Sequence, residues 1–229
     1  MSATSPQPIA LRGLVGCSGN FGLSPDGKLL AVSCSSAPGG LHQVYLLPAE
    51  GVGVPWQLTR GAEASFFQAW SPDGKTVAFT RGSASHAEIF TIAATGGPET
   101  GLTHDAVNDG PVYSPDGQYI YFDSSRSGMT QIWRMRADGS EAEQMTDDEF
   151  LNSSPHISPD GSTLAFLSQP RAHGSGFGAG VVRVMRFDDG LIQTVVELRG
   201  DRGSFSMQPW GSPKRFAFIT YQELPGSAP

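Results

Sequence analysis

The chain lacks the features of several large classes of protein. Two cysteines among 229 residues are too few for a disulfide framework, and no stretch approaches 18 consecutive apolar residues, so we expect no membrane insertion. Acidic residues outnumber basic ones and the formal net charge is −7, which argues against nucleic acid as a partner. The N-terminal segment has no charged region followed by an apolar one. We therefore expect a cytoplasmic location, or a periplasmic one if the chain is the mature form of an exported protein.

Familiar catalytic motifs are missing as well. The sequence contains no HExxH zinc motif, no GxSxG nucleophile elbow and no Walker loop. Whether the protein is an enzyme is therefore an open question at this point, and the absence of an assembled catalytic set favours a non-catalytic role.

What the sequence does contain is a repeat. The tetrapeptide Ser-Pro-Asp-Gly begins at Ser24, Ser71, Ser114 and Ser158, at spacings of 47, 43 and 44 residues, and a decayed copy begins at Ser212. Each copy separates runs rich in aromatic and β-branched residues, as in WSPDGKTVAF, and each full repeat holds about four such runs bounded by turn formers. Four short strands in a repeat of this length are typical of one blade of a β-propeller.

The recurring turn has a structural explanation. Pro fixes φ at the second position of a type I turn, Ser and Gly suit its ends, and Asp can accept hydrogen bonds from nearby backbone N–H groups. We therefore interpret the repeated aspartates as turn residues and not as catalytic carboxylates; they are Asp26, Asp73, Asp116 and Asp160.

The repeats resemble those of the TolB-like β-propeller family. The resemblance rests on the four SPDG units, on NDGPVYSPDGQYIYFDSSRSGMTQIWRMRADGS and on PHISPDG, and it covers about residues 17–221. It implies an all-β propeller fold. Family members commonly have six blades, whereas this chain has four full units and one partial unit.

We expect one domain, residues 1–229, that forms an all-β propeller of five blades with four antiparallel strands each. Leu11 precedes Ser24 by 13 residues, as Leu58 precedes Ser71, so PIALRG matches the outer strand PWQLTRG of the next unit. The N-terminal strand is therefore predicted to complete the last blade. The alternative is that the chain lacks a first blade and leaves an open edge with which a second copy could pair, so the protein is a monomer or such a dimer. Whether the ring holds five blades or an interrupted six stays open.

Candidate ligand-binding residues come from the position of the turn. The innermost strand of each blade lines the central channel of a propeller, and the residues just before SPDG lie near its mouth. Polar side chains there could bind a ligand; they are Asn20, Gln68, Asn108, Asp109, Asn152, His156 and Gln208. The alternative is that they satisfy backbone groups and channel water, and Asp109 could instead serve a turn at Gly110.

His156 supports a second interpretation. Oligogalacturonate lyase, a related propeller enzyme, holds a divalent metal with several His and a Gln in its channel, and His156 and Gln208 could match that set. A stable metal site needs at least three convergent ligands. The favoured interpretation therefore has no cofactor, and the alternative has a divalent metal such as Mn or Ca.

The two cysteines leave two possibilities open. In a hairpin with Leu23 opposite Lys28, Cys17 and Cys34 would face each other, so a cross-strand disulfide is possible. Because the context is apparently cytoplasmic, free thiols are the default expectation.

Three functional hypotheses remain. The favoured one is a non-catalytic binding or scaffold module that recognises a protein, a carbohydrate or another small ligand at the channel mouth. The second is a metal-assisted carbohydrate lyase or hydrolase, and the third is a piece of a larger assembly.

Overall fold

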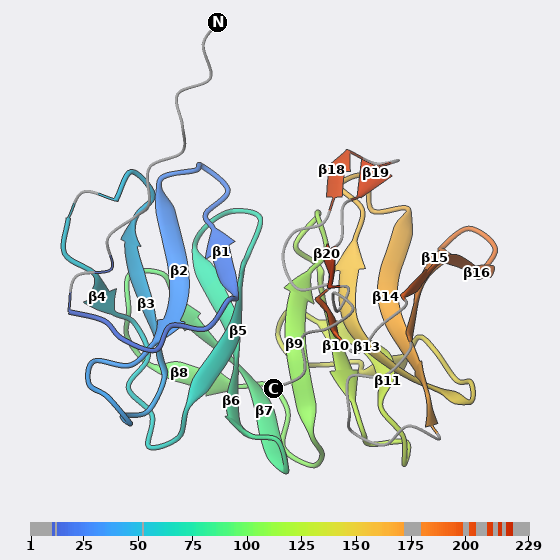
Figure 1. The fold of residues 1–229 in the computed structure, drawn as a ribbon, viewed down its shortest axis with the longest axis horizontal. Coiled ribbons are helices and arrows are strands. Elements are labelled where there is room, and N and C mark those ends of the chain that lie inside the picture. The colour runs from blue at the N-terminus through green and yellow to red at the C-terminus, as the bar shows by residue number, and fades with distance from the viewer. Residues whose placement is uncertain are drawn as a thin grey trace, which may run out of the picture.

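The computed structural model describes residues 11, 13–51, 53–171, 180–198, 202–204, 210–212, 215–216 and 219–221. The elements in these residues are β-strands, and most of them belong to four-stranded antiparallel sheets (Figure 1). Within this part of the chain, no helix has the length and apolar character needed to cross a membrane. The prediction of an all-β fold is confirmed.

Four complete blades follow one another along the chain. The first blade consists of β1 (Phe21–Leu23), β2 (Leu29–Cys34), β3 (Gln43–Pro48) and β4 (Trp56–Gln57). The second consists of β5 (Ser65–Trp70), β6 (Thr76–Ser83), β7 (His86–Ala93) and β8 (Glu99–Gly101). The third consists of β9 (Asn108–Tyr113), β10 (Tyr119–Ser124), β11 (Gln131–Arg136) and β12 (Glu143–Gln144). The fourth consists of β13 (Phe150–Ile157), β14 (Thr163–Pro170), β15 (Gly180–Arg186) and β16 (Ile192–Leu198).

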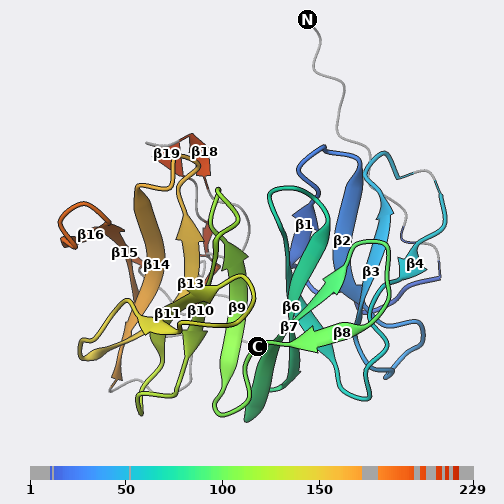
Figure 2. The ribbon, with the colours of Figure 1, turned by 180° about the vertical axis from the view of Figure 1, so that it is seen from behind.

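The strands of each blade pair in chain order, and the first strand is the innermost one. β1 contacts β5, β5 contacts β9, and β9 contacts β13. In Figure 1 these four strands stand toward the middle of the molecule, while β4 and β16 lie at its outer edges, and Figure 2 shows the same separation of the sheets from behind. This is the radial arrangement of a propeller.

The partial fifth unit contributes paired strands at the C-terminal end. β17 (Arg202–Ser204) pairs with β20 (Ile219–Tyr221), and β18 (Trp210–Ser212) pairs with β19 (Arg215–Phe216), both antiparallel. Both pairs lie around the decayed SPDG copy at Ser212, so the partial unit also forms antiparallel strands.

Apolar side chains fill the space between neighbouring sheets. Phe79, Phe122 and Phe166 each stand eight residues after the Ser of an SPDG turn, and each is fully buried. Because a twisted sheet with two apolar faces needs a cover on each face, neighbouring blades bury each other. The repeated apolar pattern of the second strand therefore follows from the ring.

The outer edge of each blade contributes one apolar residue to the next interface. Leu58, Leu102 and Met145 follow the fourth-strand position in their blades, and each packs in the cluster of the following blade. Leu11 packs in the same way against Val32 and its neighbours in the first blade. The sequence register is therefore supported at Leu11, but the residues that would pair with the last blade lie outside the described part of the chain.

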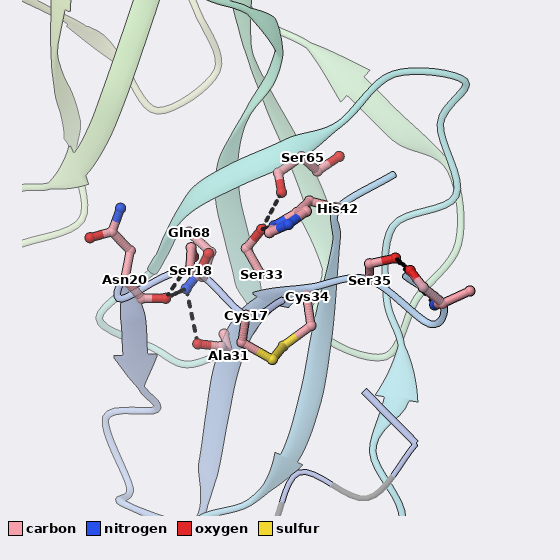
Figure 3. The surroundings of a disulfide bond; sticks show 11 residues. Cys17, Ser18, Asn20, Ala31, Ser33, Cys34, Ser35, His42, Ser65 and Gln68 are labelled. Atoms are coloured by element: carbon pink, nitrogen blue, oxygen red, sulfur yellow. Dashed lines mark hydrogen bonds between the residues drawn. A yellow bond between two sulfur atoms is a disulfide. The ribbon is translucent and has the colours of Figure 1, made fainter. Parts of the chain in front are cut away.

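Cys17 and Cys34 form a disulfide, so the expectation of free thiols was wrong (Figure 3). Their Cα atoms are 4.0 Å apart, and Cys34 is fully buried at the end of β2. The bond fixes the segment before β1 onto the face of the first blade.

The assumed hairpin register was wrong as well, although it led to the right pair. Leu23 lies opposite Leu30, not opposite Lys28. The segment before β1 pairs with β2 in a different register, as the hydrogen bond from Ser18 N to Ser33 O at 2.9 Å shows. This change of register brings the two cysteines together, and the spacing of residues in the sequence does not predict it.

The SPDG turns are held by their own side chains. In all four, the Ser hydroxyl donates to the Asp Oδ1 at 2.5–2.7 Å, and its oxygen accepts from the backbone N–H five residues later at 2.9–3.0 Å. The hydrogen bond from the Ser hydroxyl is the main reason why the pKa of each of these aspartates lies below its ordinary value. These carboxylates are turn residues, as the sequence indicated.

Candidate binding site at the channel mouth

The innermost strands share a distortion four residues before the SPDG serine. β5, β9 and β13 each carry a bulge there, and Phe67, Gly110 and Ser154 have positive φ values of 48°, 60° and 56°. Glycine accepts this conformation readily, but it is costly for Phe and Ser. Because the bulge recurs in three blades, we interpret it as a regular feature of the repeat that changes the direction of the following side chains.

A cavity of about 300 Å³ lies at these bulges. Side chains from all four complete blades line it, including Asn20, Phe21, Phe67, Gln68, Asp109, Asp123 and His156. Two larger hollows, of about 510 and 520 Å³, lie along the outer strands instead, beside Gln144 and Trp56 respectively. The smaller cavity is the one that the innermost strands share.

Four of the predicted site residues meet at this cavity. Asn20, Gln68, Asp109 and His156 all line it, although they come from four different blades. That any of them binds a ligand remains a prediction. Gln208 lies outside the described residues.

Asn108 and Asn152 do not line the cavity, because both are fully buried in contacts between blades. Asn108 Nδ2 donates to Glu88 Oε2 at 2.9 Å, and Asn152 Nδ2 donates to Gln131 Oε1 at 2.8 Å. Both asparagines stand six residues before an SPDG serine. They are packing residues of the interfaces.

These asparagines belong to a repeated hydrogen-bonded unit, which we call the latch. It consists of a Gln or Glu within the first three residues of the third strand, the Thr that ends the blade, and the start of the next blade. Thr59 donates to Gln43 Oε1 and Thr146 donates to Gln131 Oε1, both at 2.7 Å, and Thr103 donates to Glu88. Each threonine oxygen also accepts from the backbone N–H that follows the Gln or Glu, at 2.9 Å. The latch explains why the repeats close on Leu-Thr or Met-Thr.

Asp123 is the cavity residue that the sequence interpretation missed. It lies opposite Asp109 in the pairing of β10 with β9, and its Oδ2 accepts a hydrogen bond from Ser154 N at 3.1 Å. Asp109 Oδ1 accepts from Gly110 N at 2.8 Å. Burial raises the pKa of both carboxyls, and the neighbouring charge of Asp109 raises that of Asp123 further.

A sequence signal for Asp123 did exist. It stands nine residues after the SPDG serine, where the other full units have Ser33, Thr80 and Leu167. In the run YIYFDS, alternation places Asp123 on the opposite face from the buried Phe122. A carboxylate at a strand position that other repeats fill with uncharged residues is the unusual feature.

Within the part of the chain that the structure describes, the side-chain amide of Gln68 forms hydrogen bonds through its nitrogen but not through its oxygen. Its Nε2 donates to the carbonyl oxygens of Asn20 and Ala31, at 2.8 and 3.0 Å (Figure 3). Its Oε1 is buried and has no partner among the described residues, although the residue is only 7% exposed and lines the cavity. A buried acceptor without a donor is unfavourable unless something else occupies the site.

We expect Asp123→Asn to raise the free energy of unfolding at pH 7, by roughly 1–2 kcal/mol, the usual scale for an imperfectly compensated buried group. The folded pKa of Asp123 is raised, so its favourable contribution is present at low pH, where it is protonated, and is lost as the pH rises through that value. Asn keeps an oxygen that can accept from Ser154 N. Thermal unfolding measured from pH 4 to 8 should show the variant's advantage growing with pH; a constant difference would contradict this account.

Of the two metal ligands proposed from the sequence, the structure describes only His156. Within the described ranges, no group of three or more His, Cys, Asp or Glu side chains is arranged to hold a metal ion. The other proposed ligand, Gln208, lies outside those ranges, so the metal and the lyase activity remain predictions without a test.

Radially packed four-stranded sheets and a cavity shared by their innermost strands define a β-propeller with an accessible channel mouth. Comparison with known proteins gives the family. The profile of the TolB beta propeller domain matches residues 62–206, and an uncharacterized protein from Agrobacterium fabrum is 37% identical over 95% of this chain and 74% of its own length. The chain belongs to the TolB β-propeller family.

Solved structures agree with this assignment. A TolB-type structure from Agrobacterium tumefaciens superposes with a TM-score of 0.87 at 36% identity, covering 96% of this chain and 80% of the other. TolB from Acinetobacter baumannii, at 24% identity and a TM-score of 0.69, shows the same fold over 86% of this chain and 47% of its own. The Tol-Pal system protein TolB from Anaeromyxobacter dehalogenans is 35% identical over 38% of this chain, which spans only a fifth of that protein.

Proposed function

We propose that the protein is a non-catalytic binding module that recognises a peptide segment of a partner protein at the channel mouth. A curated relative is a Tol-Pal system protein, and a role within a multi-protein system is compatible with a rigid repeat scaffold.

The exposure of two phenylalanines at the mouth carries the proposal. Phe21 and Phe67 are 48% and 37% exposed, and both line the cavity. Phe67 additionally keeps the left-handed conformation, which is strained for a bulky residue. Exposed aromatic rings beside a concave site with polar groups are typical of surfaces that anchor a partner.

We also propose an oxidising compartment, such as the periplasm, as the place of action. The Cys17–Cys34 disulfide supports this, because disulfides persist in oxidising compartments and are rare in the cytosol. This proposal replaces the cytoplasmic location that the N-terminal sequence suggested.

Panning a displayed library of random 12-residue peptides on the immobilised protein tests the binding function. We expect enriched peptides, measured by fluorescence anisotropy, to lose at least about tenfold in affinity for Phe67→Ala, which corresponds to about 1.4 kcal/mol. Leu191→Ala is the matched control, since Leu191 is 46% exposed but lies outside the cavity. Peptides whose affinity is the same for Phe21→Ala, Phe67→Ala and Leu191→Ala would exclude the mouth as the binding site.

A further inference from the structure

Three side chains give the cavity a group of hydrogen-bond acceptors. Asp109 and Asp123 contribute two adjacent carboxyl groups, and Gln68 contributes a buried Oε1 that no donor among the described residues reaches. The amide nitrogen of Gln68 is already used by two carbonyl oxygens. Asn20 and His156 in the same lining carry donor groups, but Gln68 Oε1 and the two carboxyl groups are acceptors that a donor of the ligand could use.

No lysine or arginine among the described residues serves this site. None of them lines the cavity, and none forms an ion pair with Asp109 or Asp123. Two other half-buried carboxylates do have such a partner, since Asp148 pairs with Arg183 at 2.8 Å and Glu99 pairs with Arg81. Asp109 and Asp123 are half-buried, and a carboxylate removed from water without a cation is poorly compensated for its lost hydration.

We propose that this cavity binds a primary ammonium or guanidinium group of the ligand, such as a Lys or Arg side chain or the amino terminus of a partner peptide. The inference rests on the proposed function, because the cationic group belongs to the segment that the mouth recognises. Ammonium and guanidinium groups carry three or more donors and one positive charge. The donors can bond to the two carboxylates and to Gln68 Oε1, and the positive charge attracts the carboxylates.

A cationic organic group fits the site better than a metal ion does. The described residues provide no group of three His, Cys, Asp or Glu side chains for coordination, whereas two carboxylates and an amide oxygen suffice for an ammonium group. Phe21, Phe67 and Trp70 also line the cavity, so aromatic faces are present for the alkyl stem and for cation–π contact. A volume of about 300 Å³ is at the small end for ligand pockets and suits one side chain.

Small matched probes test the inference without a known partner. The probes are n-butylammonium and N-propylguanidinium chlorides, with n-butanol and butyrate as neutral and anionic counterparts, titrated into ¹⁵N-labelled full-length protein at constant ionic strength. We expect saturable shifts of the Ser154 and Gly110 amide resonances with the two cations, since these amides donate to Asp123 and Asp109. Butanol and butyrate should bind at least tenfold more weakly.

Variants test whether the two carboxylates are responsible for cation binding. Asp109→Asn and Asp123→Asn should each weaken the cation-induced shift at least tenfold, while Glu50→Gln, at an exposed turn far along the chain from the cavity residues, should leave it unchanged. Equal binding of butanol, no saturable shift, or a shift that survives both substitutions would overturn the inference. Phe67-dependent peptide binding would remain in that case, so the two proposals can fail separately.

Discussion

Removal of the Cys17–Cys34 disulfide is expected to lower the free energy of unfolding by about 3 kcal/mol. The cysteines are 17 residues apart in sequence, and closing a loop of this size in the unfolded chain is worth about that much. For a chain of this length the corresponding fall in Tm is roughly 6–12 °C. This is a large fraction of the stability of an ordinary domain.

The effect should be concentrated in the first blade. Leu11, Leu14 and Cys17 cover the apolar face that Val32 and Leu47 present, and the disulfide is the covalent link that holds this cover. Hydrogen exchange should therefore accelerate most around β2 and β3 when the bond is absent. The SPDG turns of the later blades make no contact with the disulfide and should keep their protection.

Calorimetry of the Cys17→Ser/Cys34→Ser double variant, with and without reductant, measures the effect. Reductant should lower the Tm of the wild-type protein toward that of the variant and should leave the variant itself unchanged. Mass analysis of alkylated, non-reduced protein provides the direct check. Two alkylated thiols in protein purified from an oxidising compartment would contradict the bond, and the proposed location would lose its support.

The fold was predictable because its signals repeat. Each SPDG turn depends on contacts among residues within five positions, so its geometry is contained in the local sequence. The alternating, largely buried second strand and the Leu-Thr or Met-Thr that ends each of the first three blades are also visible as sequence patterns, although the threonine bonds to residues 15 or 16 positions away. Several copies in register made the β-propeller the simplest interpretation.

The site was only partly predictable because its geometry depends on a bulge. Counting back from the turn gave a set of polar residues, but the irregular inner strands place Asp109 and His156 at the cavity and Asn152 in an interface. Counting alone does not show which of the two places a residue takes. Asp123 reaches the cavity from the second strand, through pairing across the sheet, and was missed for that reason.

The latches give the second large effect, because one of them differs from the other two. Gln43 and Gln131 each donate from Nε2 to backbone carbonyls two and four residues after the latch threonine, at 2.8–3.2 Å. Glu88 takes this place in the second blade, and its Oε1 is buried without a recorded partner. A carboxylate can accept from Thr103 and Asn108 but cannot donate to carbonyls.

Glu88→Ala should therefore lower the free energy of unfolding by roughly 3 kcal/mol, because Thr103 and Asn108 both lose a buried acceptor. Glu88→Gln should do the opposite and raise it by about 1 kcal/mol, since the amide restores the acceptor and adds the donors that the other latches have. Denaturant unfolding measures the change in the free energy of unfolding for both variants. Gln131→Ala in the third blade is the matched control for the loss of a latch. If Glu88→Gln destabilised the protein as much as Glu88→Ala, the negative charge of Glu88 and not its hydrogen-bonding geometry would hold the second and third blades together.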